Sequence, residues 1–308
     1  MPIFNPMLVW GGIKLVSIDI TNPPNNVNYQ TGQSFDPAGM EVTATYSNGA
    51  TLLATGWTYS PNGALTEETQ SITIVYTEGG VSAQATQAIT VQREDSFADS
   101  EWSEIIAACQ SGSVPDSWGV GDSKPMTING TSYQIDIIGK NHDEYADGSG
   151  KAPLTFQMHD CYADTKDMNG SATNSGGWGS CDMRTTHLPA IKALMPAEVQ
   201  AGLKKVQKLT SAGNQSSDIN TTEDDLFLLS EVEIFGSLTH SKSGEGTQYD
   251  YYSAGNSRVK NQNGGVSSWW ERSPRGSVSS AFCIVSGSGN ANRSSANASI
   301  GVAFGFCF

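Results

Sequence analysis

Apolar and polar residues alternate in short runs through the first third of the chain. The runs "VSIDI", "MEVTATY", "QSITIVY" and "QAITV" all have a period of two, so each predicts a strand that buries one face. Ser47-Asn48-Gly49 and Glu78-Gly79-Gly80 fall where hairpin turns need positive φ, and Pro23-Pro24 indicates an edge or a crossing between sheets. Several short strands at this spacing predict a β-sandwich over residues 13–94.

The same segment carries residues in an order typical of one module family. They are Tyr29, Gly32, Phe35, Asp36, Gly39, Tyr46, Gly49 and the run Tyr76-Thr77-Glu78-Gly79-Gly80. On these residues the segment resembles a bacterial immunoglobulin-like (Big-type) module. The resemblance implies a spacer or a weakly adhesive unit of a bacterial or phage surface protein, and we expect a stalk.

The pattern changes after residue 94, where "REDSFADS" predicts a linker over residues 93–100. Asp99 or Ser100 is expected to cap a helix whose apolar stripe is Trp102, Ile105, Ile106 and Cys109. A hairpin is predicted at Asn129-Gly130. Further helices are predicted between 187 and 209, and after Thr222 as N-cap. In the second helix of the 187–209 stretch, Pro196 lies near the first position and one face carries Val199, Leu203 and Val206.

Six motifs extend over about 200 residues of this second part: "WGVGD", "IIGKNHDEYADGSGKAPLTFQMHDCY", "GGWGSCDMR", "DDLFLLSEVEIFG", "WWERSP" and "GVAFGFCF". Together they resemble a domain family of unknown function from phage and gut-bacterial surface proteins. That family is similar to the C-type-lectin-like fold of formylglycine-generating enzymes and of receptor-binding proteins diversified by retroelements. Ala303-Phe304 replaces the more usual Arg-Pro pair, so any role of that arginine is lost.

The expected fold is therefore mainly β with α+β, in three parts. Residues 1–12 form an N-terminal attachment segment, 13–94 an immunoglobulin-like β-sandwich, and 95–308 a C-type-lectin-like α+β domain. The N-terminus has no basic region and only a broken apolar run, which argues against a secretory signal or a membrane span. A net charge of −14 with few charged residues disfavours nucleic acid and anionic membranes as partners.

Few residues suggest catalysis or metal binding. His142-Asp143-Glu144 and His159-Asp160 lack the i, i+4 histidine pair of a helical zinc site, and a structural hydrogen-bonding role is expected for both clusters. Ser273 lies in no nucleophile elbow. We expect no enzyme activity, no metal and no cofactor. An enzyme of the formylglycine-generating kind is the third alternative. Such enzymes use a close cysteine pair, whereas Cys283 and Cys307 are 24 positions apart in this sequence.

The five cysteines show no CxxC spacing, so buried free thiols are expected. A bridge between Cys283 and Cys307, which are far apart in the sequence, stays open as an alternative.

The C-terminal stretch separates into an apolar frame and a polar display. Trp269-Trp270, Phe282 to Val285 and Ile300 to Phe304 predict strands, and Trp269, Trp270, Phe282, Ile284 and Phe304 are expected to be buried. The tract between them is rich in Ser, Asn, Gly and Ala, which supply adaptable hydrogen bonds as binding loops do. The predicted ligand-binding residues are Arg275, Ser277, Ser279, Asn290, Asn292, Arg293 and Asn297. Solvated loops without a ligand are the alternative, and Tyr249, Tyr251 and Tyr252 are a second candidate rim.

These features together predict a non-enzymatic bacteriophage virion protein, such as a tail or head fibre, that is assembled in the host cytoplasm and displayed on the particle. Its C-terminal domain is expected to bind a host-surface glycan or protein, and its N-terminal segment other virion proteins. A homo-oligomer, with a trimer as one form, would compensate for weak single-site affinity. The asparagines of the tract, Asn290, Asn292 and Asn297, fit diversification by a retroelement. The alternative is a structural decoration protein of the capsid or tail without a ligand.

Overall fold

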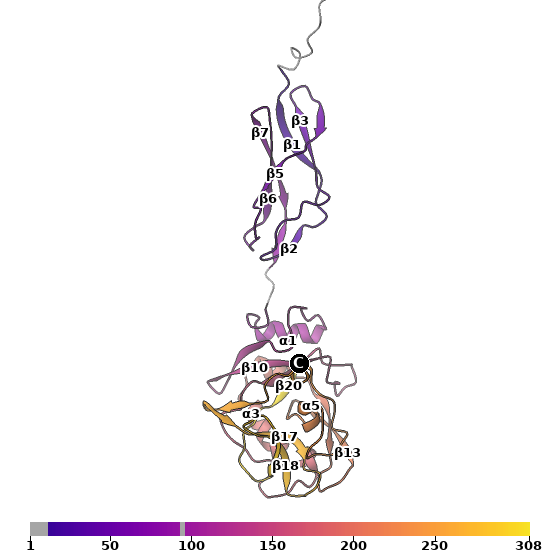
Figure 1. The fold of residues 1–308 in the computed structure, drawn as a ribbon, viewed down its shortest axis with the longest axis vertical. Coiled ribbons are helices and arrows are strands. Elements are labelled where there is room, and N and C mark those ends of the chain that lie inside the picture. The colour runs from indigo at the N-terminus through magenta and orange to yellow at the C-terminus, as the bar shows by residue number, and fades with distance from the viewer. Residues whose placement is uncertain (1–11, 93–95) are drawn as a thin grey trace, which may run out of the picture. The chain divides into compact units, whose positions relative to one another are not determined.

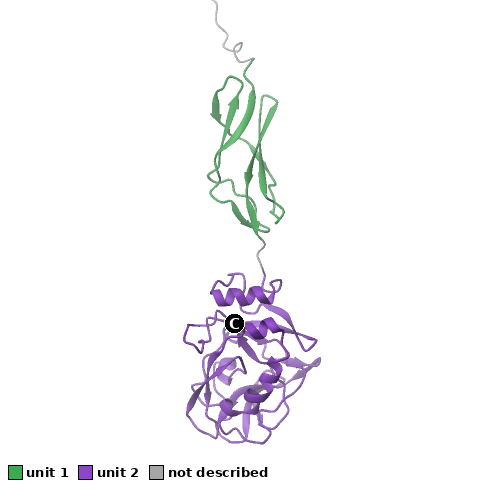
Figure 2. Cartoon of the chain, turned by 180° about the vertical axis from the view of Figure 1, so that it is seen from behind, with its two compact units in different colours: residues 1–94 green, residues 95–308 purple. Residues whose placement is uncertain are grey.

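A computed structural model describes residues 12–92 and 96–308 of the chain (Figure 1). The fold is mainly β with short helices, as predicted. The chain divides into two compact units, residues 1–94 and 95–308 (Figure 2). The predicted attachment segment, apart from Gly12, and residues 93–95 of the predicted linker lie outside the described residues.

Unit 1 consists of two three-stranded antiparallel sheets and one parallel pair of strands. The first sheet has the order β1 (Leu15–Asn22), β3 (Glu41–Tyr46), β4 (Thr51–Leu53). The second has the order β5 (Thr58–Ser60), β6 (Ser71–Glu78), β7 (Val81–Ala88), and β2 (Asn28–Gln30) pairs with β8 (Thr90–Gln92). Gly49, Gly79 and Gly80 have φ values of 81°, 56° and 81°, which confirms both predicted turns.

The apolar positions of the alternating strands form the core of unit 1. Ile18 of β1, Val42 and Ala44 of β3, and Ile72 and Ile74 of β6 are buried in one cluster. Because side chains along a strand point alternately to opposite faces, the period-two runs place one apolar face of each sheet against the other. The alternation therefore predicted both the strands and the residues that pack in the core between the two sheets.

Unit 2 is built around a five-stranded sheet with the order β14-β20-β11-β10-β9. Its strands are β9 (Ser123–Ile128), β10 (Thr131–Lys140), β11 (Leu154–Met158), β14 (Leu226–Phe227) and β20 (Gly305–Cys307). Ile128 pairs with Thr131, and φ is 48° at Asn129 and 77° at Gly130, so the hairpin predicted at these two residues is confirmed.

Helix α1 (Trp102–Ser111) packs on this sheet close to the C-terminus of the chain (Figure 1). The Trp102 ring lies edge-on to Phe156 of β11 and to Phe308, with centroids 6.2 and 6.0 Å away. The stripe is as predicted, but the cap is not Asp99 or Ser100: Glu101 is the N-cap and forms a capping box with Glu104. Phe97 is also buried, so the predicted linker ends before it.

Of two other helix predictions, one was correct at its start and too long at its end, and the other was wrong. Helix α4 (Ala197–Gly202) follows Pro196 as predicted but ends at Gly202, and Val206 begins strand β12 (Val206–Ser211). Thr222 caps no helix, because it lies in β13 (Ile219–Asp224), where it pairs with Lys208 of β12. The helix begins nine residues later as α5 (Glu231–Phe235), and Ser230 and Glu233 form its capping box.

The other helical turns are α2 (Gly177–Ser180), the π-helical turn η2 (Met183–His187), α3 (Leu188–Lys192) and α6 (Asp250–Ser253). The remaining strands are the pair β15 (Lys260–Gln262) and β16 (Gly265–Ser267), and a sheet with the order β17 (Trp269–Pro274), β18 (Ala281–Val285), β19 (Ala291–Ser295). The strand predicted over 300–304 is not formed. Ile300 and Gly301 make isolated bridges, and β20 starts at Gly305. No helix in residues 12–92 or 96–308 is long and apolar enough to span a membrane.

The two units should fold independently, because their apolar clusters have no residue in common. Fragments 13–94 and 95–308 are each expected to unfold cooperatively, at midpoints within a few degrees of the transitions seen for the intact chain by scanning calorimetry. Limited proteolysis should cut first between Arg93 and Ser100, on the N-terminal side of the buried Phe97. A fragment that fails to fold alone, or first cuts inside either unit, would contradict independent folding.

Candidate functional site

The polar tract near the C-terminus forms the edge of a small sheet. All five residues of the central strand β18 are buried, whereas Asn292 and Arg293 of the neighbouring strand β19 are exposed. The residues predicted to form the frame (Trp269, Trp270, Phe282, Ile284 and Phe304) are all at most 5% exposed, which confirms their burial. The sheet therefore holds a polar edge strand beside a central strand whose five side chains are all apolar and buried.

The seven predicted ligand-binding residues lie around this edge, but not on one face. Asn292 pairs with Ile284 and Arg293 with Cys283, so the two side chains point to opposite faces of the sheet. Asn290 precedes the strand, while Asn297 lies at its other end, next to the loop that carries Arg275, Ser277 and Ser279. Five of the seven are exposed, and Arg275 and Ser279 are half-buried. The structure describes no hydrogen bond from the buried Nε of Arg275.

Asn174, which belongs to no motif predicted to be functional, fixes the loop between β17 and β18. Its Nδ2 donates to the carbonyl oxygens of Val278 and Ala281 at 2.9 and 2.8 Å, and its backbone N–H donates to that of Ser279 at 2.7 Å. Its Oδ1 accepts from the backbone N–H of Asn214 at 2.8 Å. The residue is completely buried, so one side chain holds together segments more than a hundred positions apart.

A buried ionic network lies behind this sheet and contains Asp143, Lys208, Glu233 and Arg272. Arg272 grips Glu233 with both Nη atoms and also donates to the carbonyl oxygens of Leu209, Leu228 and Glu245. Lys208 Nζ donates to Asp143 Oδ1 at 2.5 Å and to Glu233 Oε1 at 3.3 Å. All four side chains are at most 5% exposed, so their charges compensate each other in a place that water does not reach.

The network keeps its carboxylates ionised. Burial raises the pKa of Asp143, but the Lys208 ammonium and its hydrogen bond outweigh burial, so the net shift is downward. Burial also raises the pKa of Glu233, but the positive charges of Arg272 and Lys208 lower it by more, so its net shift is downward as well. The cluster predicted at His142-Asp143-Glu144 thus has a structural role through Asp143. In the other cluster, His159 Nδ1 lies 2.8 Å from Asp136 Oδ2.

The tyrosines proposed as an alternative rim are core residues. Tyr249 and Tyr252 are at most 1% exposed, and Tyr251 is 9% exposed. The Tyr249 hydroxyl donates to Asp143 Oδ2 at 2.9 Å and accepts from Lys208 Nζ, while the Tyr252 hydroxyl donates to Gln157 Oε1 at 2.6 Å. The prediction of an aromatic rim here is wrong, because the polar end of each of these two rings is needed to satisfy buried partners.

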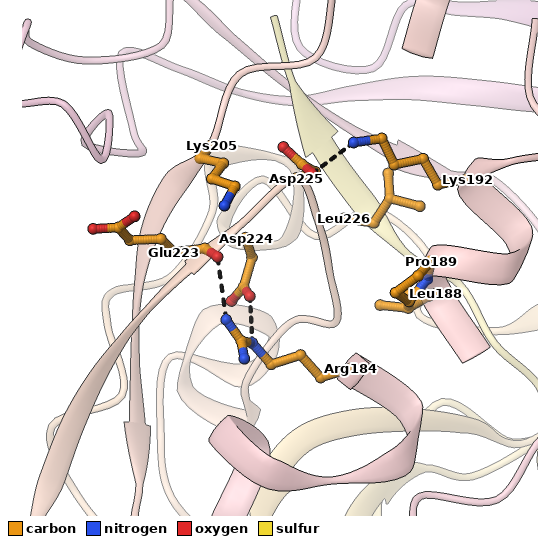
Figure 3. Close-up of a pocket in the computed structure, with 9 residues that line it drawn as sticks. All are labelled: Arg184, Leu188, Pro189, Lys192, Lys205, Glu223, Asp224, Asp225 and Leu226. Atoms are coloured by element: carbon orange, nitrogen blue, oxygen red, sulfur yellow. Dashed lines mark hydrogen bonds and ion pairs between the residues drawn. The ribbon is translucent and has the colours of Figure 1, made fainter. Parts of the chain in front are cut away.

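A charged pocket of about 260 Å³ lies where β13 and β14 meet η2 and α3 (Figure 3). Arg184 Nε donates to Asp224 Oδ1 at 2.5 Å, and Lys192 Nζ to Asp225 Oδ2 at 2.6 Å. Trp178 Nε1 holds the other oxygen of Asp224 at 2.9 Å. Lys205 borders the pocket and forms no ion pair with any residue that the structure describes. Because the lining carries three basic and three acidic side chains, its charges balance, and the pocket favours a small polar molecule over an ion of either sign.

The family assignment rests on a large part of unit 2. The sequence pattern of a family described as "Domain of unknown function (DUF6273)" matches residues 154–307, half of the chain. The chain belongs to this family. Comparison with curated proteins gives no match.

The DUF6273 segment closes on itself in the structure. It begins at Leu154, the first residue of β11, and ends at Cys307, the last residue of β20, and these two strands are neighbours in the central sheet. Lys208, Glu233 and Arg272 lie inside the segment, whereas Asp143 lies before it. The DUF6273 segment therefore contains the frame and the polar edge, and the preceding residues supply α1, the β9–β10 hairpin and the fourth charge of the network.

All five cysteines are free and buried, as the prediction of buried thiols stated, and the bridge between Cys283 and Cys307 is not formed. Burial raises the pKa of both of these thiols well above the usual value, so little thiolate is present near neutral pH. Within the described parts of the chain, no three His, Cys, Asp or Glu residues are grouped so that they could hold a metal ion.

Proposed function

We propose that the chain is a non-enzymatic attachment protein of a bacteriophage particle. Unit 1 serves as an immunoglobulin-like spacer, and unit 2, a C-type-lectin-like domain, binds a glycan or a protein on the host surface. The N-terminal segment joins the chain to other virion proteins, and copies assemble as a homo-oligomer. The single observation that carries the proposal is the exposed polar edge around β19, held on a layer of completely buried residues.

The position of this edge within unit 2 supports a binding role. The chain enters unit 2 near α1, where Phe97 packs edge-on against Trp102 at 6.2 Å. Figure 1 shows α1 at one end of unit 2, and β17 and β18 toward the opposite end. The strand that pairs with β18 therefore lies away from α1 within unit 2, and its Asn292 and Arg293 side chains are exposed.

The buried chemistry supports a scaffold more than a catalyst. The ionisable groups of the network form ion pairs with each other. The thiols of Cys283 and Cys307 are buried, and their raised pKa values keep them protonated. A formylglycine-generating type of reaction needs accessible thiols that ionise readily, and the thiols of Cys283 and Cys307 are buried and have raised pKa values.

A structural role in the particle is the second candidate, and one observation favours it. Three large apolar side chains of unit 1, Val16, Leu52 and Leu53, are each about 60% exposed, and the two leucines lie on the edge strand β4. Exposed apolar side chains on an edge strand are suited to contact with another protein. This surface fits a contact with neighbouring virion proteins, and it is compatible with a binding function of unit 2.

The proposed binding edge is tested by replacing six of its residues with alanine in one variant of the full chain: Ser277, Ser279, Asn290, Asn292, Arg293 and Asn297. Arg275 is left intact because its Nε is buried. Each change should alter the free energy of unfolding by no more than about 0.5 kcal/mol. Binding of the labelled protein to a panel of gut-bacterial strains, measured by flow cytometry, should be abolished because the contacts that specify the partner are gone.

The matched control replaces exposed polar residues of the β12–β13 hairpin, Gln207, Asn220 and Thr221, with alanine, and it should bind as the wild type does. Undiminished binding by the folded six-residue variant would exclude this edge as the binding surface. If the wild-type protein binds no strain of the panel, the structural role would be favoured.

A further inference from the structure

A second concave surface of unit 2 lies apart from the residues of the proposed edge. It is a groove of about 450 Å³ between the first residues of β10, the segment after β11 and the β15–β16 hairpin. Small-molecule sites commonly have volumes of about 300 to 1,000 Å³. The groove is therefore large enough for a ligand, and its three walls come from parts of the sequence separated by up to 133 positions, from Thr131 to Gly264.

One wall is held rigidly in place by the β15–β16 hairpin. The backbone N–H of Asn261 donates to Asp160 Oδ1 at 2.7 Å, and the backbone N–H of Cys161 donates to the carbonyl oxygen of Asn261 at 2.8 Å. Below them, the buried Lys260 Nζ donates to the carbonyl oxygens of Met158 and His159 at 2.6 and 2.8 Å. The Asp160 carboxylate and the Asn261 amide are thus held side by side by bonds within the protein, so binding would require little further ordering of them.

The opposite wall adds an aromatic ring and further hydrogen-bonding groups. Tyr133 stacks on Tyr162, with ring centroids 5.6 Å apart, and its hydroxyl accepts from the backbone N–H of Ala163. That hydroxyl still has its own proton to donate. On the hairpin wall, Asn263 in the turn between β15 and β16 is fixed by a 3.1 Å bond from its Nδ2 to the carbonyl oxygen of Ala163, which leaves its Oδ1 available as an acceptor.

The lining has a definite chemical character. It contains one carboxylate, that of Asp160, and no basic side chain, while the other polar groups are amides, hydroxyls and a phenol. A carboxylate next to an amide can accept from one hydroxyl and donate to its neighbour, and an aromatic ring can contact the C–H face of a sugar. The single negative charge disfavours phosphate, sulfate or carboxylate groups, since no cation in the lining would compensate them.

We propose that this groove binds a neutral saccharide through Asp160, Asn261, Asn263 and Tyr133. The inference rests on the proposed function, in which unit 2 is the ligand-binding part, and it names the class of ligand. The β15–β16 hairpin, which forms one wall of the groove, also lies beside the turn between β18 and β19. A Cβ atom on Gly287, in the turn between β18 and β19, would lie 3.1 Å from Cγ1 of Val266 in the β15–β16 hairpin. A glycan seated in the groove could therefore extend toward the edge strand.

The test measures binding of the full-length protein to immobilised oligosaccharides presented at high density, because multivalent display strengthens weak single-site binding. One set contains neutral glucose, galactose, mannose and N-acetylglucosamine units, and the other sialylated and sulfated glycans. The wild type should bind members of the neutral set. Asn261→Ala, which keeps every backbone bond of the hairpin, should weaken that binding at least tenfold.

The matched control is Asn220→Ala, which removes another exposed strand asparagine, in β13, and should leave saccharide binding within twofold of the wild type. Ser132→Trp provides a second variant that fills the groove without touching a bond of the hairpin, and it should abolish binding while the melting temperature is unchanged. Binding of acidic glycans only, no binding of any neutral saccharide, or wild-type affinity in both groove variants would overturn the inference. In each case, loss of cell binding by the six-residue edge variant would still support the proposed function.

Discussion

Replacing Arg272 with methionine should lower the free energy of unfolding of unit 2 by about 3 to 5 kcal/mol. Arg272 is completely buried, and its guanidinium satisfies both oxygens of Glu233 and three backbone carbonyl groups. Methionine fills a similar volume but leaves the Glu233 carboxylate with Lys208 as its only cation, in a place from which water is excluded. Removing one partner of a buried ion pair is costly because the other charge stays behind. Urea unfolding followed by near-UV circular dichroism measures the loss.

Three further variants separate the charge from the volume. Arg272→Lys should recover only part of the stability, because one ammonium cannot replace a planar fork that serves five acceptors. Arg272→Met combined with Glu233→Met should be more stable than Arg272→Met alone, since no uncompensated charge remains. Arg293→Met, at an exposed arginine of β19, should change stability by less than about 0.5 kcal/mol. Equal losses at Arg272 and Arg293 would show that the network contributes nothing.

Unit 1 could be predicted from the sequence because its strands carry their signal locally. In "MEVTATY" and "QSITIVY", Val42, Ala44, Ile72 and Ile74 alternate with polar residues, and all four are buried. Each strand faces the core on one side and solvent on the other, which is the condition under which a period of two is informative. The positive φ of Gly49 likewise follows from its place in a hairpin turn.

The secondary structure of unit 2 was harder to predict from the sequence, because tertiary pairing overrides the local helix and strand preferences there. Thr222 followed by acidic residues is a good helix start, yet Thr222 pairs with Lys208 across a hairpin. Lys208 itself is a strand residue whose ammonium is buried against Asp143, 65 positions away. Long-range polar partners of this kind leave no periodic trace in a sequence. The motif "WWERSP" supports the family resemblance, but its sequence does not indicate that Glu271 and Arg272 are buried.

The candidate site shows the same division between local and distant information. Burial of Trp269, Trp270 and Phe282 follows from their size and apolar character, and it was predicted correctly. The grouping of the display residues was only partly foreseeable, because it depends on the register that puts Asn292 and Arg293 on opposite faces. Asn174 could not be found at all, since its importance lies in carbonyl groups of residues 278 and 281.

Glu271→Gln should stabilise unit 2 at neutral pH, although Glu271 is the neighbour of Arg272 in the buried strand β17. Glu271 is completely buried, and neither carboxylate oxygen has a hydrogen-bond partner among the residues that the structure describes. Burial raises the pKa of Glu271 well above its usual range, and repulsion from Glu231 and Glu245 raises it further. The folded state therefore keeps a proton on Glu271 that the unfolded chain releases.

The sign of the pH dependence follows from this difference. Well below pH 4.5, the carboxyl group is protonated in both states and has little effect on stability. Above that pH, the unfolded chain loses the proton while the folded protein retains it, so each pH unit costs the wild type about 1.4 kcal/mol. A neutral glutamine has no such dependence. The variant should thus match the wild type near pH 4.5 and exceed it by about 2 to 4 kcal/mol at pH 7.5.

Denaturant unfolding of both proteins at several pH values between 4.5 and 8 measures this difference directly. Burial also raises the pKa of Glu245, but that group contributes equally to both proteins and cancels. Glu223→Gln, at an exposed position of β13, is the matched control and should follow the wild type at every pH. A stability difference between Glu271→Gln and wild type that stays constant across the pH range would mean that Glu271 does not hold a proton in the folded protein. In that case the buried carboxylate must be ionised, and a compensating cation would have to lie beside it.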